Sequence, residues 1–360
     1  MMNQAFWRGK RVLVTGHTGF KGSWLCSWLH SMGAVVQGYA LAAPTTPNLF
    51  GVLGLEERIL SEIGDIRDTA SLTACVNRFQ PEIVFHLAAQ PLVRLSYASP
   101  MDTYTTNVIG TVSLLDAVRH TDHVKAVVNV TSDKCYENRE WAWGYREDEA
   151  MGGFDPYSSS KGCSELVTAS YRQSFFNANE YSRHGCALAS ARAGNVIGGG
   201  DWALDRLIPD LLSAFKDRRT VSIRNPHAIR PWQHVLEPLS GYLALAEKLY
   251  TEGMAYACGW NFGPSEDDAR PVQWIVEKLA ALWGRDAAWA VDVGSHVHEA
   301  HYLKLDCSKA RGQLGWQPRW RLEHTLSRIV NWHNAWCSHQ EMYDYTMMEI
   351  NDYMNAQASI

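Results

Sequence analysis

Two residues four positions apart, Tyr157 and Lys161, have side chains suited to proton transfer. The residues that follow them have a composition suited to a helix, and residues at i and i+4 lie on one face of a helix. A fixed ammonium favours phenolate over phenol, whereas an unperturbed tyrosine, with a pKa of about 10, is a poor base near neutral pH. The pair therefore indicates a tyrosine base assisted by a lysine, although the same spacing is common on solvated helices.

A second polar group, Ser132-Asp133-Lys134, comes directly after an apolar segment at 125–131 that is typical of a buried strand. In a parallel sheet, ligands bind at the carboxyl ends of the strands. The position of these three residues therefore indicates that they belong to a site.

A glycine-rich turn, G-H-T-G-F-K-G at 16–22, follows a strand pattern at 10–15 and precedes a helical pattern. Strand, turn and helix in this order are the context of a dinucleotide-binding turn. We expect Gly16 to permit the tight turn, Gly19 to let the backbone approach a pyrophosphate, and Gly22 to allow close packing. The helix N-terminus would then face the phosphates.

The adenosine end of such a ligand is less clearly marked. The second strand pattern, at 34–40, continues into A-L-A-A-P, which holds neither an acid for a ribose hydroxyl nor an arginine for a 2′-phosphate. The sequence therefore does not distinguish NAD from NADP. His17, inside the glycine turn, could donate to a phosphate oxygen or face solvent, and His86, on an apolar strand, is expected to be a core histidine.

The elements that must position these residues alternate along the chain. Strand patterns at 83–89, 125–131 and 186–192 are separated by helical patterns at 69–79, at about 100–119 and after Tyr157. This alternation predicts an α/β fold with a doubly wound parallel sheet of the Rossmann type.

From about residue 196 the alternation fades, which predicts a smaller, mostly C-terminal substrate-binding lobe. We expect an NAD-binding domain at 1–190 with a returning segment near 225–250, and a discontinuous lobe at 191–360. The aromatic helical pattern at 322–354 is expected to pack against its own lobe, with a dimer contact as the alternative.

The composition argues against several classes of protein. A net charge of −5 gives no electrostatic argument for nucleic acid or an anionic membrane. No apolar run reaches the roughly 18 residues of a membrane span, and the N-terminus leaves no room for a signal peptide. Eight scattered cysteines without C-x-x-C spacing indicate reduced thiols and no zinc site. We expect a soluble, cytoplasmic protein without a bound metal.

Seven motifs, in family order, resemble those of the extended short-chain dehydrogenase/reductase family. They are G-H-T-G-F-K-G at 16–22, G-D-I-R-D at 64–68, H-L-A-A-Q at 86–90, Asn107, V-T-S-D at 130–133, Y-S-S-S-K at 157–161 and G-N-V-I-G at 194–198. Three further blocks, at 192–203, 205–210 and 230–239, resemble the nucleotide-sugar 4,6-dehydratases within that family and indicate CDP-glucose as the substrate.

The resemblance implies a lyase with tightly bound NAD that serves deoxysugar and O-antigen synthesis. A hydride leaves C4 of the glucose while Tyr157 takes the C4 hydroxyl proton; Lys161 lowers the Tyr157 pKa and holds the nicotinamide ribose. Ser132 hydrogen-bonds the C4 oxygen, and Asp133 donates a proton to the departing C6 hydroxyl. The hydride then returns to C6, and the product is the 4-keto-6-deoxy sugar.

The resemblance also implies binding residues. Asp65 and Ile66 would contact adenine, Asn107 would support the loop after its strand, and Asn195 and Arg230 would reach the substrate diphosphate. Trp202 or Trp232 could stack on sugar or cytosine. The implied cofactor contacts are Gly16, His17, Gly19, Phe20, Gly22, Asp65, Ile66, Leu87, Ala88, Ala89, Asn107, Tyr157 and Lys161, and the implied substrate contacts are Gln90, Arg94, Asn195, Arg206 and Arg230.

Lys134 departs from the pattern, because other 4,6-dehydratases have at this position a glutamate credited with removing the C5 proton. A lysine acts as a base only if its pKa falls by several units from about 10.4. Otherwise it binds a phosphate or stabilises the enolate, and the sequence leaves these alternatives open.

Two other functions also stay open: a dehydratase or 4-epimerase acting on another nucleotide-sugar, and a non-catalytic NAD-sensing protein. The family resemblance further implies a homo-oligomer, dimer or tetramer, paired through helices near 100–119 and 157–176.

Overall fold

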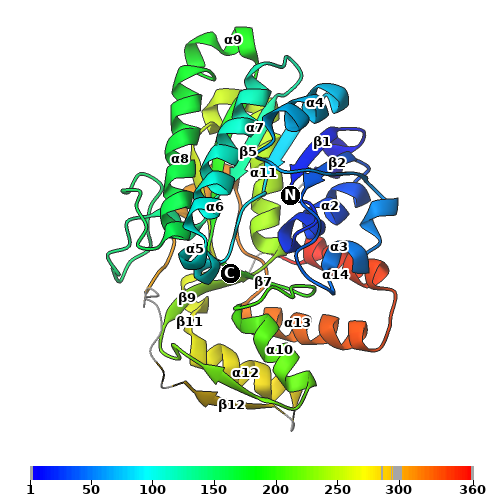
Figure 1. Cartoon of the computed structure of the whole chain (residues 1–360), viewed down its shortest axis with the longest axis vertical. Helices are drawn as coiled ribbons and strands as arrows, with labels where there is room; N and C mark the ends of the chain where they lie inside the picture. The colour runs from blue at the N-terminus through cyan, green and yellow to red at the C-terminus, as the bar shows by residue number, and fades with distance from the viewer. Residues whose placement is uncertain (1–2, 285–286, 293, 295–301, 358–360) are drawn as a thin grey trace.

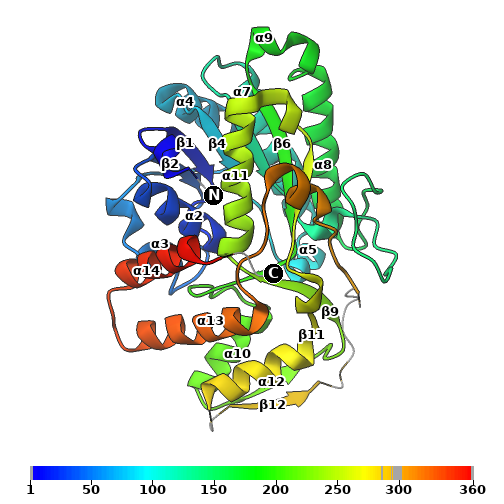
Figure 2. The ribbon, with the colours of Figure 1, turned by 180° about the vertical axis from the view of Figure 1, so that it is seen from behind.

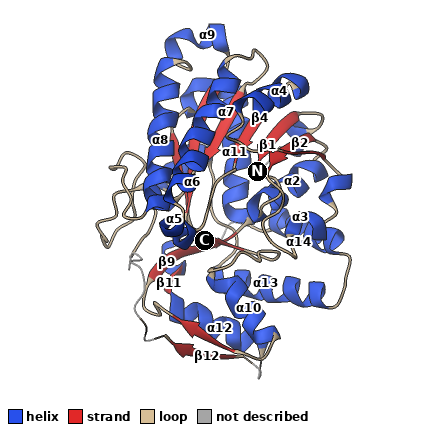
Figure 3. Ribbon diagram, viewed as in Figure 1, coloured by secondary structure: helices blue, strands red, loops and turns tan. Residues whose placement is uncertain are grey.

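The computed structural model describes residues 3–284, 287–292, 294 and 302–357. Its larger part is a parallel sheet covered on both faces by helices, and a smaller lobe lies against the carboxyl ends of the strands (Figure 1, Figure 3). The strands are β1 (Arg11–Thr15), β2 (Val35–Ala40), β3 (Leu60–Ile63), β4 (Ile83–His86), β5 (Ala126–Val130), β6 (Ala187–Ala193), β7 (Asn195–Ile197), β8 (Thr220–Ile223), β9 (Ile229–His234), β10 (Gly259–Phe262), β11 (Ala269–Pro271) and β12 (Ala288–Val291). The helices are α1 (Gln4–Trp7), α2 (Phe20–Ser31), α3 (Leu49–Val52), α4 (Thr69–Phe79), α5 (Val93–Ala98), α6 (Pro100–Tyr104), α7 (Gly110–Arg119), α8 (Pro156–Ser174), α9 (Tyr181–His184), α10 (Leu207–Lys216), α11 (Leu236–Glu252), α12 (Val272–Trp283), α13 (Leu322–Cys337) and α14 (Met342–Asn355).

The large sheet has seven parallel strands in the order β10-β6-β5-β4-β1-β2-β3. Val12 of β1 pairs with Val36 on one side and with Ile83 on the other. The central strands β4 and β5 are buried at every position, which explains their continuous apolar patterns. The predicted doubly wound α/β fold is confirmed.

Two helical layers enclose this sheet. α4, α7 and α8 cover the face seen in Figure 1, and α2 and α11 cover the face seen in Figure 2. The predicted helix at about 100–119 is present as α6, a π-helical turn at Thr105–Ile109 and α7. Such π-turns are frequently found at functional sites, and this one contains Asn107.

The smaller lobe has its own apolar core, which includes Leu211, Ile275 and Leu326 from α10, α12 and α13. Two short sheets, β11-β9-β7 and β12-β8, complete it. Between these segments the chain returns to the large sheet as α11 and β10. The division into domains at residue 190 stays a prediction.

The C-terminal helices pack in two different places. α13 lies in the smaller lobe beside α12 and β9, as expected. α14 packs on α13, where Trp332 Nε1 donates to the Thr346 hydroxyl at 3.1 Å, and also on α2, where Trp28 and Tyr353 meet edge to face at 5.7 Å. The tail therefore packs against its own lobe as expected, and α14 in addition completes the core beside α2.

All eight cysteines are free thiols. No helix in the described part of the chain combines the length and the apolar character that a membrane crossing requires.

Candidate active site

The glycine-rich turn connects β1 to α2 with the backbone geometry that its sequence predicts. Gly16 has φ +77°, and a Cβ there would lie 2.7 Å from the Ala88 nitrogen. A Cβ on Gly22 would overlap the backbone of Gly16. Gly19 is the N-cap of α2 and supplies no side-chain cap, so the first N–H groups of the helix remain available to a ligand.

A cavity of about 300 Å³ lies in front of this turn. It suits a dinucleotide, because a helix N-terminus, a close glycine backbone and an apolar wall meet there. The described residues contain no group of three or more His, Cys, Asp or Glu that could hold a metal ion. Among the predicted cofactor contacts, Gly16, Gly19, Phe20, Gly22, Asp65, Ile66, Leu87, Ala88, Ala89, Tyr157 and Lys161 line this cavity.

Two predicted cofactor residues lie behind the cavity wall. The His17 ring, for which a phosphate contact and a solvent-facing position were the two alternatives, is instead buried, and its Nε2 lies 2.8 Å from the Ser61 hydroxyl. Burial lowers the His17 pKa to about 4, so the ring is neutral at physiological pH. Asn107 bonds the backbone of Gln90 twice, at 2.8 and 3.1 Å, and thereby holds the loop after β4.

Gln90, which was expected to contact substrate, is not among the residues that line this cavity or the second cavity described below. Its amide donates to the Thr103 hydroxyl at 2.9 Å and to the Leu92 carbonyl at 3.1 Å, and it accepts from the Leu92 nitrogen at 2.5 Å. Gln90 therefore shapes the loop that carries Leu92 and Arg94.

α8 begins one residue before Tyr157 because its N-terminus is strongly capped. Asp155 accepts bonds from the Ser158 nitrogen at 2.9 Å and the Ser158 hydroxyl at 2.6 Å, and Pro156 occupies the first helical position. This start places Tyr157 and Lys161 on one helix face at the carboxyl end of β5, where Lys161 Nζ donates to the Val130 carbonyl at 3.3 Å.

The acidity of Tyr157 is set mainly by burial, which raises its pKa to about 12. A hydrogen bond with Ser132 and the positive charge of Arg206 lower this pKa, whereas the charge of Asp133 raises it. Arg206 is thus the cation that most favours the phenolate, a role that the sequence suggested for Lys161. Burial lowers the pKa of Lys161 to about 8, and the charge of Glu165 opposes this shift.

Ser132, Asp133 and Lys134 form a tight turn directly after β5. The Ser132 hydroxyl donates to Asp133 Oδ1 at 3.0 Å and accepts from the Lys134 nitrogen at 3.3 Å. Burial raises the pKa of Asp133, while the charge of Lys134 lowers it. Lys134 Nζ lies 6.0 Å from the centre of the Tyr157 ring.

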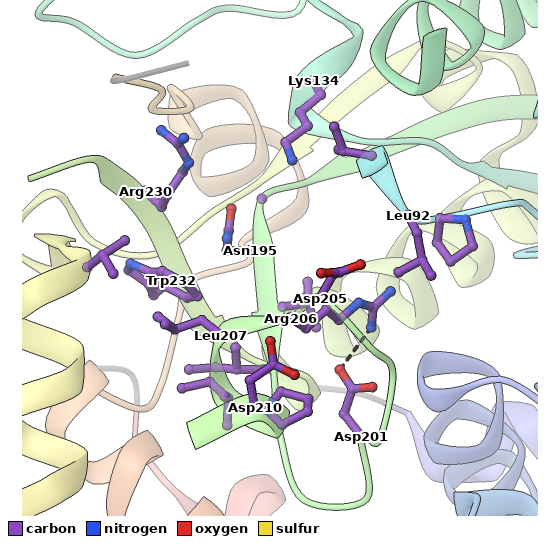
Figure 4. Close-up of a pocket in the computed structure, with 18 of the residues that line it drawn as sticks. Leu92, Lys134, Asn195, Asp201, Asp205, Arg206, Leu207, Asp210, Arg230 and Trp232 are labelled. Atoms are coloured by element: carbon purple, nitrogen blue, oxygen red, sulfur yellow. Dashed lines mark hydrogen bonds and ion pairs between the residues drawn. The ribbon is translucent and has the colours of Figure 1, made fainter. Parts of the chain in front are cut away.

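A second cavity, of about 310 Å³, opens between this turn and the smaller lobe. Figure 4 shows Lys134 and Arg230 on two sides of this cavity, with Asn195 between and below them and Trp232 below Arg230. Arg206, paired with Asp201 at 2.8 Å, completes its wall. The predicted substrate contacts Arg94, Asn195, Arg206 and Arg230 all line it, and Arg94 pairs there with Asp205 at 2.8 Å.

The two cavities share part of their walls. The shared residues are Phe20, Lys21, Pro91, Thr131, Tyr157, Asp201 and Arg206. Tyr157 therefore contacts both spaces, so a group bound in one cavity can react with a group bound in the other beside its phenol.

Lys21 is a site residue that the sequence-based predictions missed. Its ammonium has no hydrogen bond or ion pair with any described residue, although it faces both cavities. Burial and the charges of Lys161 and Arg206 lower its pKa to about 7, while Asp133 opposes this shift. The sequence does contain a signal for this role. Lys21 is a cation within the glycine turn, at a helix N-terminus, where the helix dipole makes a positive charge unfavourable.

The two tryptophans expected to stack on substrate lie in different cavities. Trp232 lines the second cavity. Trp202 lines the first and packs edge to face on Trp332 and Trp336.

Comparison with known proteins gives consistent matches over most of the chain. The family model described as GDP-mannose 4,6 dehydratase matches residues 13–329. A CDP-glucose 4,6-dehydratase of Salmonella typhimurium is 62% identical over 356 residues, which cover 99% of each chain. A dTDP-glucose 4,6-dehydratase of Haemophilus influenzae is 26% identical, with 89% of this chain and 97% of the relative covered.

Solved structures resemble the fold at lower identity. A dTDP-glucose 4,6-dehydratase of Bacillus anthracis in complex with NAD has a TM-score of 0.74 at 20% identity, covering 93% of this chain and 100% of that one. A UDP-glucose 4-epimerase of Thermotoga maritima with UDP-glucose has a TM-score of 0.75 at 21% identity, covering 91% and 99%.

Proposed function

The chain belongs to the GDP-mannose 4,6-dehydratase family, and we propose that it converts CDP-glucose into CDP-4-keto-6-deoxyglucose. Such a product would feed deoxysugar and O-antigen synthesis. The relative of 62% identity, which is named for this substrate, supports the choice of CDP-glucose.

The observation that carries the reaction type is the shared wall at Tyr157. A nicotinamide in the first cavity and a sugar in the second would meet beside this phenol. NAD, the cofactor named for the related Bacillus anthracis structure, would take up the C4 hydride and later return it to C6. The glycine turn, whose N–H groups face the first cavity, would hold its pyrophosphate.

The residues of the second cavity fit the remaining steps. Tyr157 accepts the C4 hydroxyl proton, and Ser132 holds the C4 oxygen. Oxidation at C4 makes the C5 proton acidic, and Lys134 is the group that we assign to remove it. Asp133 then protonates the C6 oxygen so that it leaves as water.

The substrate diphosphate would lie between the two sides of this cavity. Arg230 and Arg206 carry the positive charge that it needs, and Asn195 supplies an amide. Ser222, Arg224 and Asn225 line the same cavity and could accommodate the base.

We further propose a homo-oligomer that pairs through α6, α7 and α8. Met101, Ile109 and Leu166 are 74%, 51% and 61% exposed on these helices and the π-turn, and they would supply apolar contacts to a partner subunit. Eight free cysteines suit a reducing compartment, so we place the protein in the cytoplasm.

A 4-epimerase acting on another nucleotide-sugar is the second candidate, because UDP-glucose 4-epimerases share the fold. Mass spectrometry with CDP-glucose deuterated at C4 separates the two. A dehydratase loses water and retains deuterium at C6, whereas an epimerase leaves the mass unchanged and inverts C4.

The variant Tyr157→Phe tests whether Tyr157 takes part in the reaction. It should lower turnover by about 10²- to 10⁴-fold, the usual contribution of an acid–base group. Turnover near the wild-type level in this variant would remove Tyr157 from the mechanism, and no turnover of any nucleotide-sugar by the wild type would favour an NAD-sensing protein.

A further inference from the structure

The proposed reaction, on which this inference rests, ends with an extra proton on Tyr157 and a missing proton on Asp133. In each turnover Tyr157 gains the C4 hydroxyl proton, and because C4 ends as a ketone, this proton does not return to the sugar. Asp133 loses a proton to the C6 oxygen, which departs as water. The C5 proton is removed and later replaced, so it cancels. One proton must therefore travel from Tyr157 to Asp133 in every cycle.

The Ser132 hydroxyl lies between these two groups. It donates its proton to Asp133 Oδ1 at 3.0 Å. A hydroxyl oxygen also has two acceptor sites. The Lys134 nitrogen uses one of them at 3.3 Å. The other remains for the Tyr157 phenol, which lines the same cavity as Ser132 and whose pKa is lowered by interaction with Ser132.

All three side chains are shielded from solvent. Tyr157, Ser132 and Asp133 are 9%, 7% and 1% exposed. Asp133 Oδ2 is buried and has no hydrogen-bond partner among the described residues, so it is available to a substrate hydroxyl. Burial raises the pKa of both Tyr157 and Asp133, which disfavours two negative charges in this space. The pair therefore titrates as a coupled unit, in which ionisation of one group opposes ionisation of the other.

We propose that Tyr157, Ser132 and Asp133 form an internal proton relay that prepares the base and the acid of the reaction in one step. The Tyr157 O–H bond breaks as its proton passes to Ser132 Oγ, and the Ser132 proton passes to Asp133 Oδ1. The products are a phenolate and a carboxylic acid, and one negative charge has moved from Asp133 to Tyr157.

The chemical steps then reverse this distribution. The phenolate takes the C4 hydroxyl proton, and the carboxylic acid gives its proton to the C6 oxygen, whose bond to carbon breaks with the electron pair remaining on the departing water. Tyr157 is again a phenol and Asp133 a carboxylate. Tyr157 and Asp133 therefore return to their starting protonation states with no net release of a proton to bulk solvent and no net uptake from it.

A single-turnover experiment tests the relay directly. The holoenzyme is mixed with CDP-glucose in weak buffer containing a pH indicator, and absorbance at 340 nm follows the reduced nicotinamide. We expect this absorbance to rise and fall with no matching change in the indicator. Release of one proton per site during the rise, and its uptake during the fall, would overturn the relay.

Variants of Ser132 provide the second test. Ser132→Ala should lower turnover by about 10²- to 10⁴-fold, and added imidazole should partly restore it, because a small buffer then carries the proton. Ser132→Thr keeps the hydroxyl and should remain insensitive to imidazole. A Ser132→Ala enzyme that is folded, as judged by thermal melting, but does not respond to buffer would also overturn the relay.

The outcomes separate the relay from the reaction itself. A wild-type enzyme that removes no water from CDP-glucose contradicts the proposed function. One that removes water but exchanges a proton with solvent contradicts the relay alone.

Discussion

Glu165 and Arg192 form a buried ion pair at 2.9 Å beneath the segment that carries Ser132, Asp133 and Lys134. The pair holds both ends of this segment. The Thr131 hydroxyl donates to Glu165 Oε1 at 2.5 Å, and Arg192 Nη1 donates to the Tyr136 hydroxyl at 2.6 Å. Glu165 lies one helical turn after Lys161, so α8 also fixes the position of this turn relative to Tyr157.

Glu165→Gln should therefore lower both stability and turnover. Removal of one partner leaves the other charge buried, which costs about 3–5 kcal/mol in the free energy of unfolding. Denaturant titration measures this change. Glu180→Gln, in an exposed pair with Arg183, is the matched control and should change the free energy by less than about 0.5 kcal/mol. Equal effects of the two variants would contradict the anchoring role.

The same pair predicts a direction for acid sensitivity. Burial alone would raise the pKa of Glu165. The charge of Arg192 and hydrogen bonds from Arg192, Ser190 and Thr131 outweigh burial and hold this pKa below the usual value of 4.5. A depressed carboxyl pKa gives stability that is present above about pH 4.5 and is lost as the pH falls through the folded-state pKa. Wild type and Glu165→Gln should thus converge in stability as the pH falls below this range, and a constant difference would contradict the prediction.

Asp133→Asn should separate oxidation from elimination. The amide cannot protonate the C6 oxygen, so reduced nicotinamide should form slowly and then accumulate on the enzyme, without loss of water. Absorbance at 340 nm and mass spectrometry of the sugar report the two steps. Intact dehydration with no accumulation would remove Asp133 as the acid.

Lys134→Met should abolish exchange at C5. In D₂O the wild type should place deuterium at C5 of the product if Lys134 is the base that we propose. The methionine variant should still oxidise C4 but should lose this exchange by about 10²-fold or more. Retained exchange with a raised KM would instead make Lys134 a phosphate ligand. Lys134→Glu, which carries the residue of other 4,6-dehydratases, should keep part of the activity.

Lys21→Met should weaken ligand binding and stabilise the protein. Loss of a charged hydrogen bond to either ligand corresponds to about 10- to 100-fold in affinity, measured by titration of NAD and of CDP-glucose. Removal of the buried charge and of its repulsion from Lys161 and Arg206 should raise Tm by about 1–2 °C for each kcal/mol released. Lys278→Met removes an exposed lysine that lines neither cavity and pairs with Glu323, and it should change neither quantity by a comparable amount.

The increase in Tm expected for Lys21→Met should depend on pH in a defined direction. The folded-state pKa of Lys21, about 7, lies below its ordinary value of 10.5, so the unfolded chain binds more protons between these values. The loss of folding stability caused by the buried ammonium is fully present below about pH 7 and disappears toward pH 10.5. The advantage of Lys21→Met in Tm should therefore shrink as the pH rises, and a constant advantage would contradict the pKa assignment.

Local chemistry accounts for what the sequence by itself determined. The glycine turn, the capped start of α8 and the i, i+4 spacing of Tyr157 and Lys161 depend on contacts within a few residues, so their arrangement could be predicted. The continuous apolar strands likewise determined a parallel sheet, because both of its faces must be buried.

Only the tertiary structure decided which charges surround Tyr157. Arg206 reaches it from the smaller lobe, and Lys21 reaches the same space from α2. His17 and Gln90 turn away from the cavities because Ser61 and Thr103, distant in sequence, supply their hydrogen bonds. A pKa depends on burial and on charges within several ångströms, and these distances exist only once the chain has folded.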